Sequence, residues 1–388
     1  MIDAREFVTA DSDRILAEWG RIALVPAPLG GEQQRAELIA ELAAASGADP
    51  HRDRVGNVVA IVDGDDADGP AYTFLATMDD LDTVAAHRAG SDRLQRHGDR
   101  LVGPATETTS SDATALAILR FAQRDARPWR RLTIAWVLGE ETGLTGVRAL
   151  VTDRGADLGS VIDLMGGIGT VSWNAIGFAG LMVRFTTEPR HTLYGGISEV
   201  SDAIARFITE LHAHPFPVHG PPFDTDPLTA RRVNRISAGS VFNHSPATGV
   251  VGVDIRSTDP QVLAETEAAT RAAAERAAAA ANVDVVIAEG ERQPAMRLRD
   301  GRNHRLVRGL AQAIRETGHE PVLRAWSSSN INACYAAGLE GIVHDATHRG
   351  GGRGTPDEWT HIPGVLDGIA ADCRLLQLLA GASDDAAP

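Results

Sequence analysis

The chain has 388 residues, 43% of them hydrophobic and 23% charged, and its formal net charge is −15. This length and composition suit two or three folded domains and exclude wholesale disorder. The acidic charge also excludes a general binder of nucleic acid or of anionic membranes, because both surfaces attract cationic proteins.

The first part of the chain alternates between helix and strand patterns. Apolar residues at helical spacing predict helices over residues 12–22, 33–45, 113–122 and 144–153. Short apolar runs predict strands over residues 57–62, 72–77 and 132–137. Strands that alternate with helices are typical of an α/β layer with a mostly parallel sheet flanked by helices.

The pattern changes between residues 179 and 292. Alternating runs predict strands at 181–186, 250–256 and 284–288, with helices at 199–213 and 262–281. The earlier layering returns afterwards, with a helix at 304–317 and a strand ending at 341–343. We therefore predict a split α/β catalytic domain, 1–178 and 293–388, interrupted by an inserted α+β sandwich domain, 179–292.

The cysteines and the apolar runs indicate the cellular compartment of the protein. Cys334 and Cys373 form no CxxC pair, which favours a reducing compartment over a disulfide framework. The N-terminus lacks the apolar run of a signal peptide, and no stretch approaches the roughly 20 apolar residues that cross a bilayer. We expect a cytoplasmic protein without a membrane or nucleic-acid partner.

Acidic residues follow several predicted strands. Glu140 and Glu141, in the segment Gly139-Glu140-Glu141-Thr142-Gly143, come directly after the strand at 132–137. Adjacent carboxylates at a strand end can divide the work, one binding a cation and the other moving protons. The same segment could instead be a solvated turn that opens a helix.

Other acids occupy comparable positions, each with a structural alternative. Asp112 opens an apolar helix and could be its N-cap, and Asp163 precedes Gly166-Gly167 and could be a turn residue. Asp80 and Asp82 follow the strand at 72–77. Carboxylates gathered at one edge of a sheet repel one another unless cations or protons are present.

Motifs along nearly the whole chain fall in a recognisable order. They are Leu24-Val25-Pro26 with Glu32, Asp82-Thr83-Val84, Asp112, the segment from Gly139 to Gly143, Asp163, Asn243-His244-Ser245-Pro246, Asp254-Ile255-Arg256, Ser329-Asn330-Ile331-Asn332 and Pro356-Asp357-Glu358-Trp359. This ordered set resembles the co-catalytic metal exopeptidase and deacylase family. That family includes acetylornithine deacetylase, succinyl-diaminopimelate desuccinylase, aminoacylase, glutamate carboxypeptidase and peptidase T.

The resemblance implies a role for each matching residue. Asp112 would bridge two metal ions, with Glu141 on one and Asp163 on the other. Glu140 would be the general base that activates a metal-bound water. His191 would stabilise the oxyanion, commonly from a dimer partner, so the inserted domain would be a lid and a homodimer interface. The substrate would be held by Asn243 and Arg256, with Asn332 as a further candidate.

The sequence departs from that family at both histidine ligands. Asp80 stands where the first histidine belongs, and Gly354 stands where the second belongs. A carboxylate at the first position would shift preference from zinc towards manganese or magnesium, with one or two ions bound. Asp82, normally behind the histidine, would then be a like charge. His344 or His348 could supply a substitute ligand.

Alternatively, no metal binds, and Arg353 offsets the carboxylates while holding the substrate. The first reading predicts a hydrolase that cleaves an amide or related C–N bond of a small, carboxylate-bearing metabolite. The second predicts a metal-independent enzyme that uses Glu140 for elimination, cyclisation, isomerisation or acyl transfer. A non-catalytic binding protein is the third possibility.

Overall fold

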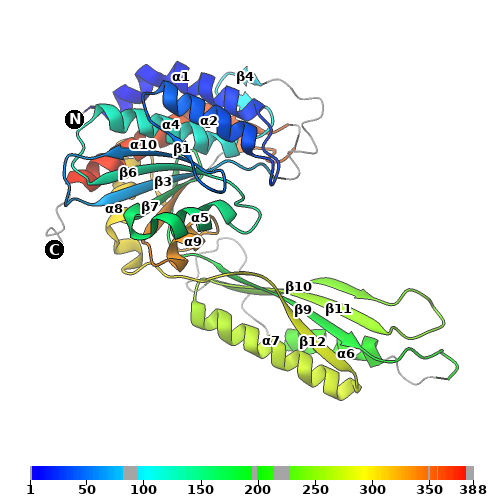
Figure 1. The fold of residues 1–388 in the computed structure, drawn as a ribbon. Coiled ribbons are helices and arrows are strands. Elements are labelled where there is room, and N and C mark those ends of the chain that lie inside the picture. The colour runs from blue at the N-terminus through cyan, green and yellow to red at the C-terminus, as the bar shows by residue number, and fades with distance from the viewer. Residues whose placement is uncertain are drawn as a thin grey trace. The chain divides into compact units, whose positions relative to one another are not determined.

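The structure, a computed structural model, describes residues 2–81, 94–194, 199–213, 228–347, 350–355 and 357–381 (Figure 1). Asp82, His348 and Arg349 lie outside the described residues. The chain divides into two compact units, one formed by Met1–Trp173 with Leu298–Pro388 and the other by Asn174–Arg297. Each unit is described separately below.

The first unit is built around an eight-stranded sheet. Its strands are β1 (His51–Arg52), β2 (Val58–Asp63), β3 (Ala71–Thr77), β6 (Arg131–Val137), β7 (Ser160–Leu164), β8 (Gly169–Ser172), β13 (Val322–Arg324) and β14 (Gly341–Ala346). Their order is β1-β2-β6-β3-β7-β14-β8-β13. The four central strands run parallel, whereas β2 and β8 pair with them in the antiparallel direction. The predicted mostly parallel mixed sheet is therefore confirmed.

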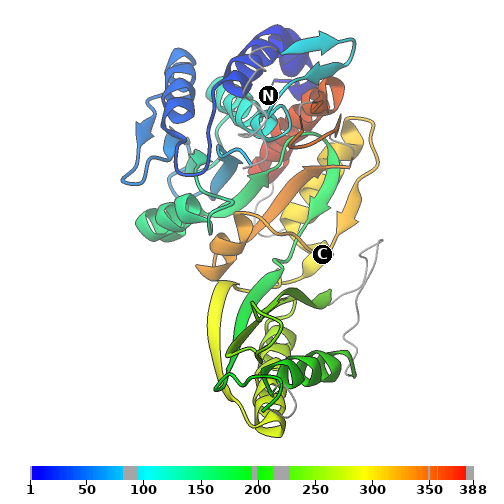
Figure 2. The same ribbon diagram turned by 90° about the vertical axis from the view of Figure 1, so that its right-hand side faces the viewer.

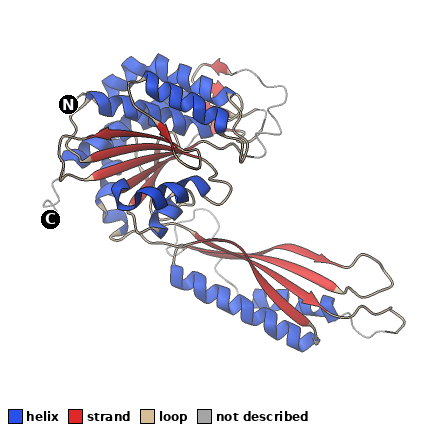
Figure 3. Cartoon of the chain, in the orientation of Figure 1, coloured by secondary structure: helices blue, strands red, loops and turns tan. Residues whose placement is uncertain are grey.

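Helices cover both faces of this sheet (Figures 1 and 3). They are α1 (Ala4–Leu24), α2 (Gln33–Ala45), α4 (Thr108–Arg124), α5 (Thr145–Arg154), α8 (Arg305–Glu316), α9 (Ile331–Ala336) and α10 (Ile362–Gly381), with short 3₁₀ helices η1 (Gly155–Leu158) and η2 (Gly301–Asn303). Helices α1, α2 and α4 lie on one face, and α5 and α9 lie on the other. Among the described residues, no helix is long and apolar enough to cross a membrane.

Helix α4 begins earlier than the sequence predicts. Its first turn contains Thr109 and Ser110, whose hydroxyls donate to the backbone carbonyls of Ala105 (2.6 Å) and Glu107 (2.6 Å). These bonds satisfy hydroxyls that are buried inside the helix layer. The Ser/Thr-rich segment is thus the start of the helix, and Asp112 lies within the helix and is not its N-cap.

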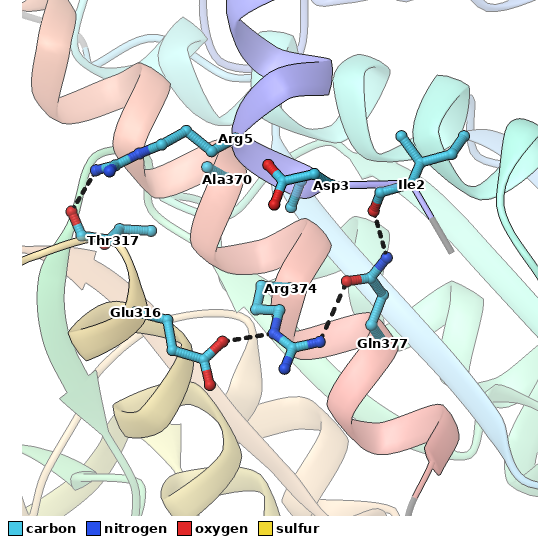
Figure 4. Close-up of a pocket in the computed structure, with 9 residues that line it drawn as sticks. Ile2, Asp3, Arg5, Glu316, Thr317, Ala370, Arg374 and Gln377 are labelled. Atoms are coloured by element: carbon cyan, nitrogen blue, oxygen red, sulfur yellow. Dashed lines mark hydrogen bonds and ion pairs between the residues drawn. The ribbon is translucent and has the colours of Figure 1, made fainter.

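Helices α1, α8 and α10 meet around a surface pocket of ≈ 390 Å³ (Figure 4). Arg374 Nε donates to Glu316 Oε2 over 2.5 Å, and this bond lowers the pKa of Glu316. Arg5 donates to the carbonyl of Thr317 at the end of α8, also over 2.5 Å. These charged side chains bond across the junction, so they hold the three helices together.

A second, smaller sheet joins distant parts of the first unit. Its strands are β4 (Gln95–His97), β5 (Arg100–Val102), β15 (Gly350–Gly351) and β16 (Trp359–His361), in the antiparallel order β15-β16-β5-β4. The Arg100 guanidinium lies 4.0 Å from the Trp359 ring centroid across this sheet. The pairing brings the segment that holds Arg353 beside the segment that leads into α4.

The second unit is a four-stranded antiparallel sheet with two helices (Figure 2). Its elements are β9 (Gly177–Thr186), α6 (Glu199–Ala213), β10 (Thr229–Ala238), β11 (Thr248–Ser257), α7 (Pro260–Ala281) and β12 (Asp284–Gln293), with strand order β10-β11-β9-β12. Alternate residues of β9 are buried, among them Phe185, which packs edge-on against Phe207 of α6. The helices thus cover one face of the sheet, as the predicted α+β sandwich requires.

Candidate active site

The carboxyl ends of β3, β6 and β7 lie at one edge of the large sheet and border a small cavity. Ligands of open α/β sheets bind at such an edge. The cavity measures ≈ 20 Å³, about the space of one water molecule. Its lining residues are Thr77, Asp79, Leu81, Glu107, Thr108, Ser111, Glu140, Glu141, Leu164, Met165 and Arg353.

Asp79 holds the turn that carries both glutamates. Its two carboxylate oxygens accept hydrogen bonds from the backbone amides of Glu140 and Glu141, each over 3.0 Å. Gly139 starts the turn with a φ of 64°, and a Cβ there would lie 2.1 Å from Thr145 Oγ1. Sequence reasoning missed Asp79, although it is the acid that comes directly after β3 and Met78.

The Glu140 carboxyl favours its protonated form. Burial, together with the charges of Glu141, Asp163 and Asp79, raises the pKa of Glu140 to about 8, whereas Arg353 acts in the opposite direction. The protonated form of Glu140 therefore predominates at neutral pH, and a fraction stays ionised. A protonated carboxyl inside a cavity can donate that proton to a reacting group.

Arg353 lies at the cavity, where it forms an ion pair with Glu107. Its Nε is 2.7 Å from Glu107 Oε2, and its side chain stays about half exposed while that of Glu107 is buried. Glu358 connects the two segments, since its carboxylate accepts from the amides of Glu107 (2.9 Å) and Gly354 (3.0 Å). Burial raises the pKa of Glu358, although the Gly354 amide and Arg353 lower it.

Asp80 points away from this cavity and into a buried ion pair. Its Oδ1 lies 2.8 Å from Nη1 of Arg35, and both side chains are almost fully buried, with 1% and 0% exposure. Its Oδ2 accepts from the amide of Ala27 (3.0 Å). The sequence reading did not include Arg35, because an arginine on an amphipathic helix is ordinarily solvated.

Asp112 is buried inside α4 and does not line the cavity. Neither of its carboxylate oxygens has a hydrogen-bond partner within the described part of the chain. Burial raises the pKa of Asp112 well above its usual range, Arg35 lowers it, and Asp80 and Asp79 raise it further. Protonation removes the charge of this buried carboxyl, whereas a cation bound to Asp112 alone would lack further ligands.

Asp163 belongs to strand β7 and not to a turn. Its Oδ2 accepts from Ser329 Oγ (2.5 Å) and from the amide of Ile331 (3.2 Å). Burial raises the pKa of Asp163 to about 6, although these bonds lower it. The predicted C-terminal motif thus supports a strand-end acid. Within that motif Asn332 accepts from the Ser329 amide (3.3 Å) and does not line the cavity.

His344 lies on the opposite face of the sheet from Asp163. The register pairs Val343 with Asp163, so the side chain of His344 points the other way. Its Nδ1 lies 2.7 Å from Asp372 of α10, in the buried helix layer. His344 is thus paired with Asp372 and does not line the cavity that Glu141 borders, so it stays only a predicted substitute for the ligand missing at Gly354.

The residues at this edge do not fit a divalent metal ion. Of the four predicted ligands, all within the described residues, Glu141 lines the cavity, but Asp80, Asp112 and Asp163 do not. The side chains around the cavity include hydroxyl and apolar groups, from Thr77, Ser111, Leu164 and Met165. Across the described ranges, no three His, Cys, Asp or Glu residues form a group that could hold a metal ion.

The remaining predicted residues lie in the second unit. His191 forms a β-bridge with His244, and the amide of Thr192 donates to the Asn243 carbonyl (3.0 Å). Arg256 lies near the far end of β11, where its Nε is 3.0 Å from Asp254 Oδ1 and its guanidinium stacks on Phe178. The second unit therefore brings His191 and Asn243 together and leaves Arg256 apart from them.

Comparison with known proteins identifies the fold. No family model matches the sequence, and no curated protein matches it. Solved structures of metal-dependent peptidases do share its architecture. Aminopeptidase PepT from Bacillus cereus superposes with a TM-score of 0.79 at 15% identity, covering 95% of this chain and 98% of that chain.

Two further solved structures show how widely this fold is used. YXEP of Bacillus subtilis, described as a dinuclear metal-binding peptidase of the M20 family, gives a TM-score of 0.73 at 12% identity over 96% and 99% of the two chains. A hydantoinase/carbamoylase family amidase from Burkholderia ambifaria gives a TM-score of 0.64 at 18% identity over 98% of each chain. The fold expected from the sequence resemblance is therefore confirmed.

Proposed function

We propose that this chain is an enzyme that breaks an amide-type C–N bond in a small, carboxylate-bearing molecule. Glu140 transfers the proton, and Arg353 binds the negative charge of the substrate. The structures with the same fold include peptidases and an amidase, which supports C–N bond cleavage as the reaction class. The observation that carries the proposal is the position of Glu140, Glu141 and Arg353 around one cavity at the catalytic edge of the sheet.

Two other catalytic strategies for such a bond, a lysine Schiff base and a cysteine nucleophile, do not suit this chain. The sequence contains no lysine, so an amine cannot form a Schiff base with the substrate. Both cysteines are buried, and burial raises the pKa of each thiol. The carboxyl groups of Glu140 and Glu141, which line the cavity, can supply acid–base catalysis instead.

Glu140 can serve both halves of a hydrolysis. The water oxygen bonds to the carbonyl carbon first, and its proton passes to the ionised form of Glu140. The protonated Glu140 then donates that proton to the leaving nitrogen as the C–N bond breaks. One water molecule is consumed, and one carboxylic acid and one amine are released.

Arg353 suits a substrate carboxylate because it is charged, half exposed and held at the cavity. Its partner Glu107 is buried. The Glu107 amide donates to Glu358, which also accepts from the amide of Gly354 next to Arg353. A planar guanidinium binds a carboxylate with two parallel hydrogen bonds. The roles of His191, Asn243 and Arg256 in substrate binding remain predictions, because these residues belong to the second unit.

The test of the proposal is Glu140→Gln, assayed with N-acyl amino acids, dipeptides and carbamoyl amino acids. We expect turnover to fall by about 10²–10⁴-fold, because proton transfer is lost while shape is retained. Glu37→Gln, an exposed glutamate on α2, is the matched control and keeps full activity. Full activity in Glu140→Gln would refute the assignment.

A second candidate, a non-hydrolytic reaction, draws support from the poor fit of the site to a metal ion. Without a Lewis acid to activate water, a protonated Glu140 could drive elimination or cyclisation with loss of the same nitrogen. Reaction in ¹⁸O-labelled water separates the two. Label in the product carboxylate supports hydrolysis, and its absence supports the second candidate.

A further inference from the structure

We propose that Arg35 takes the place of a metal ion at this edge of the sheet, and that the first unit binds no divalent metal there. The buried guanidinium provides the fixed positive charge that lets several carboxylates lie together. This inference concerns binding and stability, and it does not depend on which bond the enzyme cleaves.

Arg35 is anchored in one position by backbone carbonyls. Its Nε and Nη2 donate to the carbonyl of Val25 over 3.1 and 2.6 Å, and its Nη1 donates to the carbonyl of Met78 over 2.6 Å. The side chain is fully buried. A guanidinium held in this way cannot swing out to admit another cation.

Asp80, the acid at the expected ligand position, has both oxygens engaged by this arrangement. Arg35 Nη1 contacts Oδ1 at 2.8 Å, and the Ala27 amide donates to Oδ2. In return the Asp80 amide donates to the Ala27 carbonyl (2.8 Å). A metal ion would have to break a buried, charge-assisted pair to use Asp80 as a ligand, and this costs more than a surface pair does.

Asp79, the neighbouring acid, is also occupied without a metal. It uses both oxygens on the amides of Glu140 and Glu141. Arg35 of α2 therefore stands beside Asp80 as a fixed positive charge, in the role that a divalent ion would have.

The test measures metal on the full chain, purified without chelator. Elemental analysis is expected to find no stoichiometric metal. Calorimetric titration with Mn²⁺ and Zn²⁺ is expected to show no site on the folded protein. Chelation with EDTA is expected to leave the thermal unfolding midpoint unchanged. One metal per chain that EDTA removes, with a lowered midpoint, would overturn the inference whatever the enzyme's reaction.

Variants test Arg35 itself through the unfolding midpoint. Arg35→Met is expected to lower it, because Asp80 is left buried and unpaired, and Arg35→Met with Asp80→Asn is expected to recover part of the loss. Arg35→Lys, which keeps the charge, should lose less than Arg35→Met. The control is Arg52→Met, which removes an arginine paired loosely with Glu37 at 3.6 Å. An Arg35→Met protein as stable as wild type would also overturn the inference.

Discussion

The Asp112 carboxyl lies in the second turn of α4, fully buried, with neither oxygen hydrogen-bonded within the described residues. Burial raises its pKa, so the folded state favours the protonated acid. The protonated Asp112 carboxyl therefore contributes to stability at acidic pH, below the ordinary pKa of aspartate. This contribution is lost as the pH rises through the raised pKa that Asp112 has in the folded state.

Asp112→Asn should consequently stabilise the protein at neutral pH. The amide has the shape of the protonated acid but needs no proton, and we expect a gain of about 1–3 kcal/mol in the free energy of unfolding. The gain should shrink as the pH is lowered. Urea unfolding at several pH values measures it, with the exposed residue change Asp63→Asn as the control. A loss of stability at pH 8 would contradict this account.

Asp79 and Asp80 show how closely spaced acids acquire different tasks. They are adjacent in sequence and follow β3, but Asp79 organises the Glu140–Glu141 turn whereas Asp80 pairs with Arg35. Successive residues of an extended segment point to opposite sides. The spacing of the motif could therefore predict that an acid lies at the site, but not which of the two.

At the scale of elements, α1 and α4 are joined by a buried charge network. Arg120 of α4 donates from Nε to Asp11 (2.7 Å) and from Nη1 to Glu18 (2.7 Å), both on α1. The arginine side chain is 1% exposed. Removal of Arg120 leaves the charge of Asp11 uncompensated between the helices, whereas Glu18 keeps its ion pair with Arg14 at 2.8 Å.

Arg120→Met should lower the free energy of unfolding by about 3–5 kcal/mol. Arg21→Met is the control, since Arg21 of α1 forms an exposed bridge with Glu41 of α2 and its loss should cost less than about 1 kcal/mol. Chemical denaturation measures both. Equal, small effects would show that the buried network contributes little.

At the scale of the whole molecule, the second unit exposes large apolar side chains on two adjacent loops. Leu193 and Tyr194 are 78% and 85% exposed, and Phe242 is fully exposed beside them. The loops are tied together, since the Ser245 amide donates to the Arg190 carbonyl (2.8 Å). Apolar groups gathered in this way mark interaction surfaces, which supports the predicted homodimer through this unit.

Phe242→Asp should therefore weaken self-association. Placing a charge in an apolar interface should cost at least about 2 kcal/mol, more than tenfold in the dimer dissociation constant. Light scattering coupled to size exclusion measures the change. Val322→Asp, on an exposed residue of the first unit, should leave the assembly intact. A wild-type chain that stays monomeric at every concentration would contradict the prediction.

Much of the architecture could be predicted from the sequence, because periodicity and strand–helix alternation are local properties. The helices at 33–45 and 199–213 have the predicted bounds, and β6 differs by one residue at its start. The sequence missed β8, β10 and α10. It also placed the start of α4 five residues late, because hydroxyl side chains bonded within the helix look like a loop in the sequence.

The sequence by itself determined the α/β frame, the inserted unit and the gathering of acids at the strand ends. The resemblance also predicted that Asp80 and Gly354 stand where the family has its two histidine ligands. The tertiary structure decided what balances those acids. Arg35 is 45 residues from Asp80 along the chain, and only folding brings its guanidinium to 2.8 Å. Burial then keeps the Arg35–Asp80 ion pair in place, because separating two buried charges costs more free energy than separating a solvated pair.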